Sequence, residues 1–282
     1  MKPTISLIVL TYNEEPNLGK CLKSTEGLVS EIIVVDSGSR DGTERIAKKF
    51  GARFIIHEFK NQADQFNWAL KHANPAGDWI MRLDADEEIL PELKKEIEER
   101  LPNLGADING VVLRRRTYFL GKWMKHGGIY PTELLRIFRR GRGASEEREM
   151  DEHLTLREGK TTTFENDFID DNKKPLKEWI LKHRAYAKRE ARTHLKEKAS
   201  GDENIPAGQA GERRRSKKFY YSLPPFFRAF TYFIYRYFIR LGFLDGGKGL
   251  IFALRQVLWY RWLVDLEIWK LTKSLNENAQ KT

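Results

Sequence analysis

The sequence predicts an α/β fold with a mostly parallel central sheet, followed by a C-terminal amphipathic helical region rich in aromatic and basic residues. Two features of the first hundred residues support the sheet. Short apolar, β-branched runs alternate with segments of helical pattern, and this order gives parallel strands joined by helices. Polar residues directly follow the apolar runs, which is where ligands of such sheets bind. The third observation is the change to dense aromatic and basic residues in the last quarter of the chain.

The predicted elements of the first part follow one another as strand and helix. Strands are expected at residues 5–10, 32–35, 53–56 and 79–83. Helices are expected at residues 16–24, from 41 or 43 to 50, 62–72 and 91–100. The last of these helices has Pro91 in its first turn, where proline is well tolerated because its missing N–H would have no partner there.

From about residue 107 the pattern changes to strands separated by glycine-rich and charged loops. These strands are expected at residues 111–113, 134–138, 153–156 and 161–164, and a long helix at 175–195. Residues 197–216 contain few apolar groups and several glycines, which is typical of a flexible connector. We therefore expect a first domain at 1–195, a linker at 196–218 and a helical region at 219–282.

The segment from Phe219 to Phe243 combines many aromatic residues with Arg228, Arg236 and Arg240. Their spacing in multiples of four places the three arginines on one face of a helix. The chain has no run of 18 uncharged apolar residues, so a membrane-spanning helix is not expected. A basic, aromatic, amphipathic helix favours the surface of an anionic bilayer. The alternative is a helical cap on the first domain or a dimer interface, and both interpretations can hold together.

The formal net charge of +10 indicates an anionic partner, such as nucleic acid, a membrane surface or a phosphorylated substrate. Nucleic acid is not favoured, because the chain has no recognisable nucleic-acid-binding motif. The single cysteine, Cys21, excludes an internal disulfide and a cysteine-rich zinc site, and we expect it to pack as a small apolar residue. The apolar run at 5–10 is too short for a signal peptide, so a cytoplasmic location is expected.

Two carboxylates, Asp84 and Asp86, directly follow the predicted strand at 79–83. An extended chain places residues two apart on the same side. Such a pair suits a hard divalent cation that keeps its own waters and also binds a diphosphate. The alternative is a polar strand end with turn-forming acids, and Glu87 and Glu88 are interpreted as acids that begin the next helix.

Three motifs in this order resemble those of the family-2 glycosyltransferases, which have the GT-A fold. They are Thr11-Tyr12-Asn13-Glu14, the run from Val34 to Thr43, and Leu83-Asp84-Ala85-Asp86-Glu87. The segments 136–139 and 150–154 are similar to elements of one bacterial branch, whose members build lipopolysaccharide cores and exopolysaccharides. The resemblance covers about the first 160 residues.

The resemblance implies a nucleotide-sugar site at the strand ends. Its base and ribose would be wrapped by Thr11, Tyr12, Asn13 and Glu14. Asp36 would accept a hydrogen bond from a uracil-type ring N–H, and Lys60 would approach the diphosphate. Gln65 either joins Lys60 there or satisfies nearby backbone groups. Arg136 would bind diphosphate or acceptor phosphates, with a solvated basic strand edge as the alternative.

The resemblance also implies a Mg²⁺ or Mn²⁺ ion bound by Asp86, with Asp84 contacting the ribose or a water on the metal. Glu152 would be the base that takes the proton of the acceptor hydroxyl. Asp151 is the alternative base. Adjacent residues of a strand face opposite sides, so at most one of these two acids faces the crevice.

The implied protein is a metal-dependent inverting glycosyltransferase that moves one sugar from a nucleotide-sugar, with UDP preferred. Its acceptor would be a lipid-linked, lipopolysaccharide or exopolysaccharide glycan, and it would lie on the inner face of the cell membrane. A nucleotidyltransferase is the first alternative. It would be expected to carry a glycine-rich phosphate loop after the first strand, where this chain has Thr11-Tyr12-Asn13-Glu14. The second alternative is a non-catalytic membrane- or polyanion-binding protein on the same fold.

Overall fold

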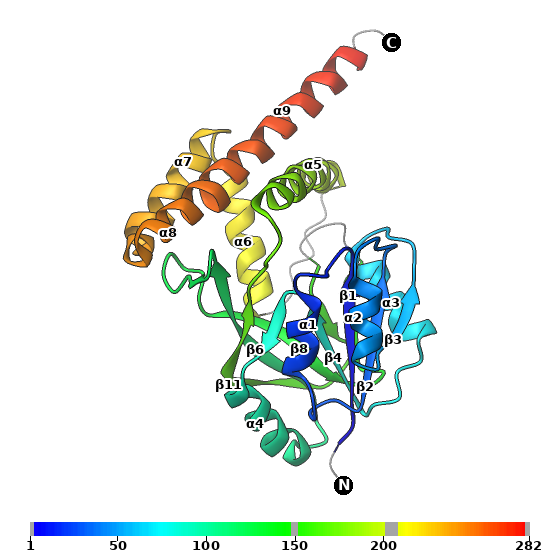
Figure 1. The fold of residues 1–282 in the computed structure, drawn as a ribbon. Helices are drawn as coiled ribbons and strands as arrows, with labels where there is room; N and C mark the ends of the chain where they lie inside the picture. The colour runs from blue at the N-terminus through cyan, green and yellow to red at the C-terminus, as the bar shows by residue number, and fades with distance from the viewer. Residues whose placement is uncertain (1–2, 148–151, 201–207, 280–282) are drawn as a thin grey trace. The chain divides into compact units, whose positions relative to one another are not determined.

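A computed structural model describes residues 3–147, 152–200 and 208–279 (Figure 1). The chain forms two compact units. The first, here called the sheet unit, contains Met1–Trp123 and Pro131–Lys174. The second, the helical unit, contains Met124–Tyr130 and Pro175–Thr282. The division at Lys174 differs from the expected boundary at residue 195, because the long helix that follows belongs to the helical unit.

Four neighbouring strands of the sheet unit run parallel, in the order β3-β2-β1-β4. These strands are β1 (Ile5–Thr11), β2 (Glu31–Asp36), β3 (Arg53–Ile56) and β4 (Trp79–Asp84). The helices of this part are α1 (Leu18–Ser24), α2 (Thr43–Lys49), α3 (Gln62–His72) and α4 (Pro91–Arg100). The predicted α/β fold class is confirmed, since strand and helix alternate as the apolar pattern indicated.

The same sheet continues from β4 through β8, β6, β11 and β5, with β7 paired to β6. These strands are β5 (Glu87–Ile89), β6 (Ile108–Phe119), β7 (Lys122–Trp123), β8 (Thr132–Arg139) and β11 (Lys160–Asp170). A separate hairpin is formed by β9 (Gly143–Ser145) and β10 (Leu154–Leu156). The interpretation of Glu87 and Glu88 as helix-initiating acids is wrong, because both lie in β5 and pair with the end of β11.

The helical unit contains α5, α6, α7, α8 and α9. Their bounds are Leu176–Ser200, Gly208–Ser222, Phe227–Ile234, Gly246–Phe252 and Tyr260–Ala279. Helix α6 therefore occupies much of the segment for which a flexible linker was expected. The aromatic segment from Phe219 to Phe243 is not one helix. Pro224 and Pro225 interrupt it, since proline lacks the N–H that a continuing helix needs.

The three arginines of this segment do not share one exposed face, contrary to the expectation. Arg228 is buried, and its Nε donates to Asp265 Oδ1 at 2.8 Å. Asp265 is also buried, and its Oδ2 accepts a hydrogen bond from the Phe226 N–H. Arg228 therefore fastens α7 to α9, whereas Arg240 is exposed.

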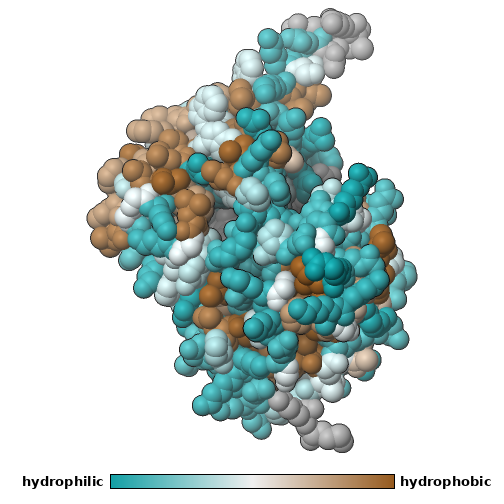
Figure 2. Space-filling model, in the orientation of Figure 1, coloured by the Kyte–Doolittle hydropathy of each residue, from teal (hydrophilic) through white to brown (hydrophobic). Residues whose placement is uncertain are grey.

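Apolar side chains remain exposed on the helical unit around α7 and α8, where Figure 2 shows a concentration of hydrophobic residues. This exposed apolar surface consists of Phe227, Phe230, Tyr235, Phe238, Ile239, Leu241, Phe243, Leu244, Leu250, Ile251, Leu254 and Trp262. Within the described part of the chain, no helix combines the length and apolar composition needed to cross a bilayer.

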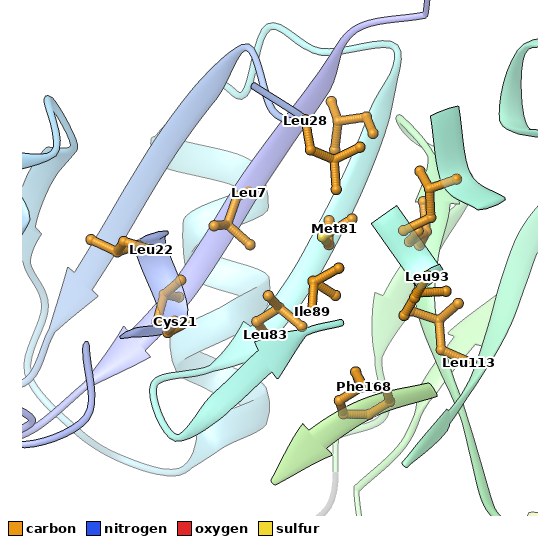
Figure 3. Packing of buried hydrophobic residues seen from close by; sticks show 14 of the residues in the cluster. Leu7, Cys21, Leu22, Leu28, Met81, Leu83, Ile89, Leu93, Leu113 and Phe168 are labelled. Carbon is orange, nitrogen blue, oxygen red and sulfur yellow. The ribbon is translucent and has the colours of Figure 1, made fainter. Parts of the chain in front are cut away.

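The core of the sheet unit lies on both faces of the sheet, because alternate residues of each strand point to opposite sides. On one face, Leu7 of β1 and Met81 of β4 pack with residues of α1 and α4, such as Leu22 and Leu93 (Figure 3). On the other face, alternate residues of the strands pack against α3. The strand ends are therefore held by a core on each side.

Candidate active site

The ends of β1 and β4 form the centre of the candidate site. The chain runs from β1 outward to β2 and β3, and then returns to place β4 on the other side of β1. Such a reversal is a topological switch point, where open parallel sheets bind their ligands beyond the strand ends. The register pairs Thr11 with Asp36 and Leu10 with Asp84. Three of the strand-end motifs thus meet at one edge of the sheet.

The loop after β1 is fixed by the loop after β2. Asn13 has a φ of 51°, a left-handed conformation that asparagine adopts more readily than most residues. Its N–H donates to Ser39 Oγ at 2.7 Å, and its side-chain Oδ1 accepts from the Arg40 N–H at 2.9 Å. In this loop Tyr12 is 58% exposed, so its ring is accessible to a ligand.

Asp36 is buried and shapes the turn that follows it. Its Oδ1 accepts hydrogen bonds from the Gly38 and Ser39 N–H groups, and its Oδ2 accepts from the Thr11 and Ser39 hydroxyls. Both oxygens are therefore engaged by the protein. The expected contact between Asp36 and a ring N–H would require one of these hydrogen bonds to be exchanged.

Asp84 lies between two buried arginines. Its Oδ1 is 3.5 Å from Arg82 Nη2, and its Oδ2 is 3.3 Å from Arg136 Nη2. Glu87 accepts a hydrogen bond from the Asp84 N–H and forms an ion pair with Arg136. Burial raises the pKa of Glu87 to about 8, although the charge of Arg136 opposes this shift. Arg136 thus holds Asp84 and Glu87 from within the sheet, and its guanidinium is not exposed for binding phosphate.

Asp86 is fixed by the residues that follow β11. Its Oδ2 accepts a hydrogen bond from Asn172 Nδ2 at 2.8 Å, and its backbone carbonyl accepts from the Asp171 N–H at 2.9 Å. The side chain of nearby Asp170 is 25% exposed. Desolvation raises its pKa to about 6, against the charge of Arg115 and with further contributions from the charges of Asp86 and Asp84. The strand ends therefore concentrate negative charge.

These carboxylates fit a hard divalent cation by their chemistry. Among the described residues, no group of three or more His, Cys, Asp or Glu side chains is arranged to hold a metal. Asp84 and Asp86 supply two carboxylates, so the remaining ligands would be waters and substrate oxygens. Mg²⁺ commonly binds in this way, with one or two carboxylates and the phosphates of its substrate.

Lys60 and Gln65, the two residues predicted to act near the start of α3, differ in their exposure. The Lys60 side chain, just before the helix, is 71% exposed and lies 3.9 Å from Asp64 Oδ1. Gln65 is buried, and its Nε2 donates to the His57 carbonyl at 3.1 Å. Of the two expected roles for Gln65, the structure therefore supports the satisfaction of nearby backbone groups.

Of the two candidate bases, Glu152 lies just before β10. Glu152 is half-buried and directly precedes His153, whose carbonyl accepts a hydrogen bond from the Glu146 N–H. Asn67 of α3 holds this hairpin by hydrogen bonds to both backbone groups of Ser145. Asp151 lies outside the described residues.

Several residues at the site were not predicted from the sequence. They are Arg82, Asn17, Asn172 and Lys174, together with the buried position of Glu87. An arginine within the apolar run 79–83 was a recognisable signal for Arg82. The polar run 170–174, directly after a strand, was the same kind of signal as Asp84 and Asp86.

Comparisons with known proteins show which proteins the chain is similar to. Residues 6–169 match the sequence profile described as glycosyl transferase family 2. The chain is 34% identical over 150 residues to the lipopolysaccharide core biosynthesis glycosyltransferase LpsC of Rhizobium meliloti, covering 50% of this chain and 53% of that protein. It is 37% identical over 94 residues to an uncharacterized glycosyltransferase of Rickettsia typhi, covering 33% of this chain and 32% of the relative.

The matches thus span about half of LpsC and about a third of the Rickettsia protein. Among solved structures, the chain is similar to glucosyl-3-phosphoglycerate synthase from Mycobacterium tuberculosis, in complex with Mn²⁺, UDP and glucosyl-3-phosphoglycerate. The two are 29% identical with a TM-score of 0.33, and the match covers 41% of this chain and 44% of the synthase.

Proposed function

Because the chain belongs to glycosyl transferase family 2, we propose that it is a metal-dependent, inverting glycosyltransferase that uses a UDP-sugar. It transfers a single sugar to a lipid-linked, lipopolysaccharide or exopolysaccharide acceptor. The observation that carries this proposal is the register that brings the ends of β1, β2 and β4 to one edge of the sheet at the switch point. The loop after β1 and the acidic residues after β4 are thereby adjacent.

In this proposal the nucleoside binds at the loop Thr11-Tyr12-Asn13-Glu14. The exposed ring of Tyr12 offers a face on which a base can stack. Asp36 holds the loop through Thr11 and Ser39, and Gln65 holds the backbone at His57, just after β3. The exposed ammonium of Lys60 approaches the diphosphate.

Asp86 would hold the cation directly, and Asp84 would contact the ribose or a water on the metal. Arg136 orients Asp84 through their ion pair. When bound, the cation neutralises charge on the departing diphosphate. The acceptor hydroxyl oxygen forms a bond to the anomeric carbon on the face opposite the diphosphate. The bond from that carbon to the diphosphate oxygen breaks as UDP leaves. Glu152 accepts the hydroxyl proton, with Asp151 as the alternative base.

Donor binding can be tested by thermal unfolding in the presence of Mn²⁺ and UDP-, GDP- or dTDP-sugars. A ligand that binds the native state stabilises it, by about 2.7 kcal/mol at a concentration a hundred times its Kd. We expect the UDP-sugars to raise Tm by a few degrees and the other two classes to raise it less. The control is the same series in EDTA, in which the increase should shrink. No increase with any nucleotide-sugar would contradict the proposed function.

We also propose that the helical unit binds the anionic inner surface of the cell membrane, close to a lipid-linked acceptor. Support comes from the exposed apolar surface together with Arg240 and Lys248, which are exposed in the same segment. Apolar side chains that enter the interface and cations that meet anionic headgroups favour the same orientation.

Changing Phe238 and Ile239 together to serine is expected to weaken binding to vesicles of anionic lipid by about tenfold or more, since burying one such side chain contributes about 1.5–3 kcal/mol. Co-sedimentation with phosphatidylglycerol-containing vesicles measures the effect. The matched control changes Ile56 and Phe59, which are 68% and 44% exposed on the sheet unit, to serine. If both double variants bind the vesicles equally well, the exposed apolar surface is not the part of the protein that contacts the membrane.

A further inference from the structure

The residues that follow β11 connect two parts of the candidate site for which the sequence predicted separate roles. Asp171, Asn172, Lys173 and Lys174, here called the strap, run past the ends of β4 and β1. Its first residue contacts Asp86, whose backbone carbonyl accepts a hydrogen bond from the Asp171 N–H at 2.9 Å. Its last residue reaches the loop after β1.

At the first end, Asn172 contacts the proposed metal ligand. Its Nδ2 donates to Asp86 Oδ2 at 2.8 Å. A neutral amide fixes the orientation of a carboxylate and leaves its negative charge in place. A lysine or arginine at the same position would cancel that charge. Hydrogen bonds of this kind to ligating groups strongly affect metal affinity in proteins. Asn172 is thus suited to hold Asp86 ready for a cation.

At the other end, Lys174 contacts the proposed nucleoside loop. Its Nζ donates to Glu14 Oε1 at 2.6 Å and to the Tyr12 carbonyl at 3.0 Å. The Lys174 side chain is only 16% exposed and that of Glu14 only 14%, so water screens this ion pair weakly. Lys174 therefore fixes both the carboxylate of Glu14 and the backbone that presents the Tyr12 ring.

Asn17 joins the two ends. It is buried, and its Oδ1 accepts a hydrogen bond from the Lys173 N–H at 2.8 Å. Its Nδ2 donates to Glu14 Oε2 at 2.8 Å. Within the strap, Asn172 Oδ1 also accepts from the Lys174 N–H at 2.8 Å. A continuous hydrogen-bonded path thus leads from Asp86 to Glu14.

We propose that the strap positions both halves of the donor site. Asn172 is a positioning residue for the cation through Asp86, and Lys174 is a positioning residue for the nucleoside through Glu14 and Tyr12. This inference rests on the proposed function and adds residues that lie far from the family motifs in the sequence. It predicts that the two ends of the strap affect different parts of nucleotide binding.

The test is calorimetric titration of the full chain with UDP, once in Mn²⁺ and once in EDTA. Asn172→Ala is expected to weaken UDP binding about tenfold in Mn²⁺ and to leave binding in EDTA unchanged, because its effect acts through the metal. Lys174→Met is expected to weaken UDP binding about tenfold in both conditions, the scale of one lost charge-assisted hydrogen bond. A merely structural role would not give this split.

Lys177→Met is the matched control, since it removes the same charge from an exposed position just beyond the strap and should leave both affinities within about twofold. Lys174→Arg should restore most of the loss by keeping the charge. The inference would be overturned if Asn172→Ala and Lys174→Met both bound UDP with wild-type affinity. It would also be overturned if Asn172→Ala weakened UDP binding equally in Mn²⁺ and in EDTA. Failure of the wild type to bind UDP would instead contradict the proposed function.

Discussion

Replacing Asp86 with alanine is expected to lower kcat/KM by about a thousandfold or more, which corresponds to about 4 kcal/mol of lost transition-state stabilisation. Asp86 is the proposed direct metal ligand, and a bound cation contributes several kcal/mol by neutralising charge on a phosphoryl leaving group. The rate of UDP release from a UDP-sugar in the presence of acceptor measures this loss. Removal of the metal from the wild type with EDTA should have an effect of similar size.

The fold should survive this substitution, because Asp86 is partly exposed and its backbone contact with Asp171 does not involve the carboxylate. Circular dichroism and the thermal unfolding curve check this. Asp107→Asn is the matched control, since Asp107 is an exposed acid paired with Lys160 away from the strand ends. Activity of Asp86→Ala that matches this control, or full wild-type turnover in EDTA, would exclude the metal assignment.

The parallel part of the sheet could be predicted from the sequence because its signals are local. An apolar run such as 5–10 is compatible with a strand buried on both faces, and β1 occupies Ile5–Thr11. β5 could not be predicted in this way. It has only three residues, and its strand conformation depends on pairing with β11, about eighty residues later in the sequence. Glu87 is buried there, and its carboxyl group is bound by Arg136 from another strand.

The same difference between local and distant signals applies to the site. The sequence indicated Tyr12, Asp84 and Asp86 because each directly follows a predicted strand. It did not show that Arg136 is buried against Asp84, where its guanidinium is not exposed for binding phosphate. Nor did it indicate Lys174, whose partner Glu14 is 160 residues away. Such pairings depend on the tertiary fold, which residue types and spacing do not specify.

In the helical unit, aromatic content was a better guide than helical periodicity. Spacing by multiples of four grouped Arg228 with Arg236 and Arg240, but Tyr235–Ile239 forms a π-helix, in which residues four apart no longer lie on one face. Arg228 then lies at the start of α7, where Asp265 of α9 binds it in the interior. The apolar residues that remain exposed support the proposed membrane contact independently of that periodicity.

Glu152 offers the sharpest test of the proposed chemistry, because a general base affects turnover without binding the donor. Glu152→Gln preserves the size and polarity of the side chain but removes the carboxylate that accepts the proton. We expect kcat to fall by about a thousandfold, within the range of about 10²–10⁴ that general base catalysis contributes. The Kd for UDP in Mn²⁺ should stay within about twofold, since no role in nucleotide binding is proposed for Glu152.

The control for Glu152→Gln is the adjacent substitution Asp151→Asn, which removes a carboxylate one residue earlier in the chain. Because the sequence predicts that at most one of these two acids faces the crevice, the two substitutions should not have equal effects. If Glu152 is the base, Asp151→Asn retains most of the wild-type kcat. A large loss in Asp151→Asn with near-normal turnover in Glu152→Gln would assign the proton transfer to Asp151. Near-normal kcat in both variants would place the base outside this pair and would remove the basis for the proposed acceptor side.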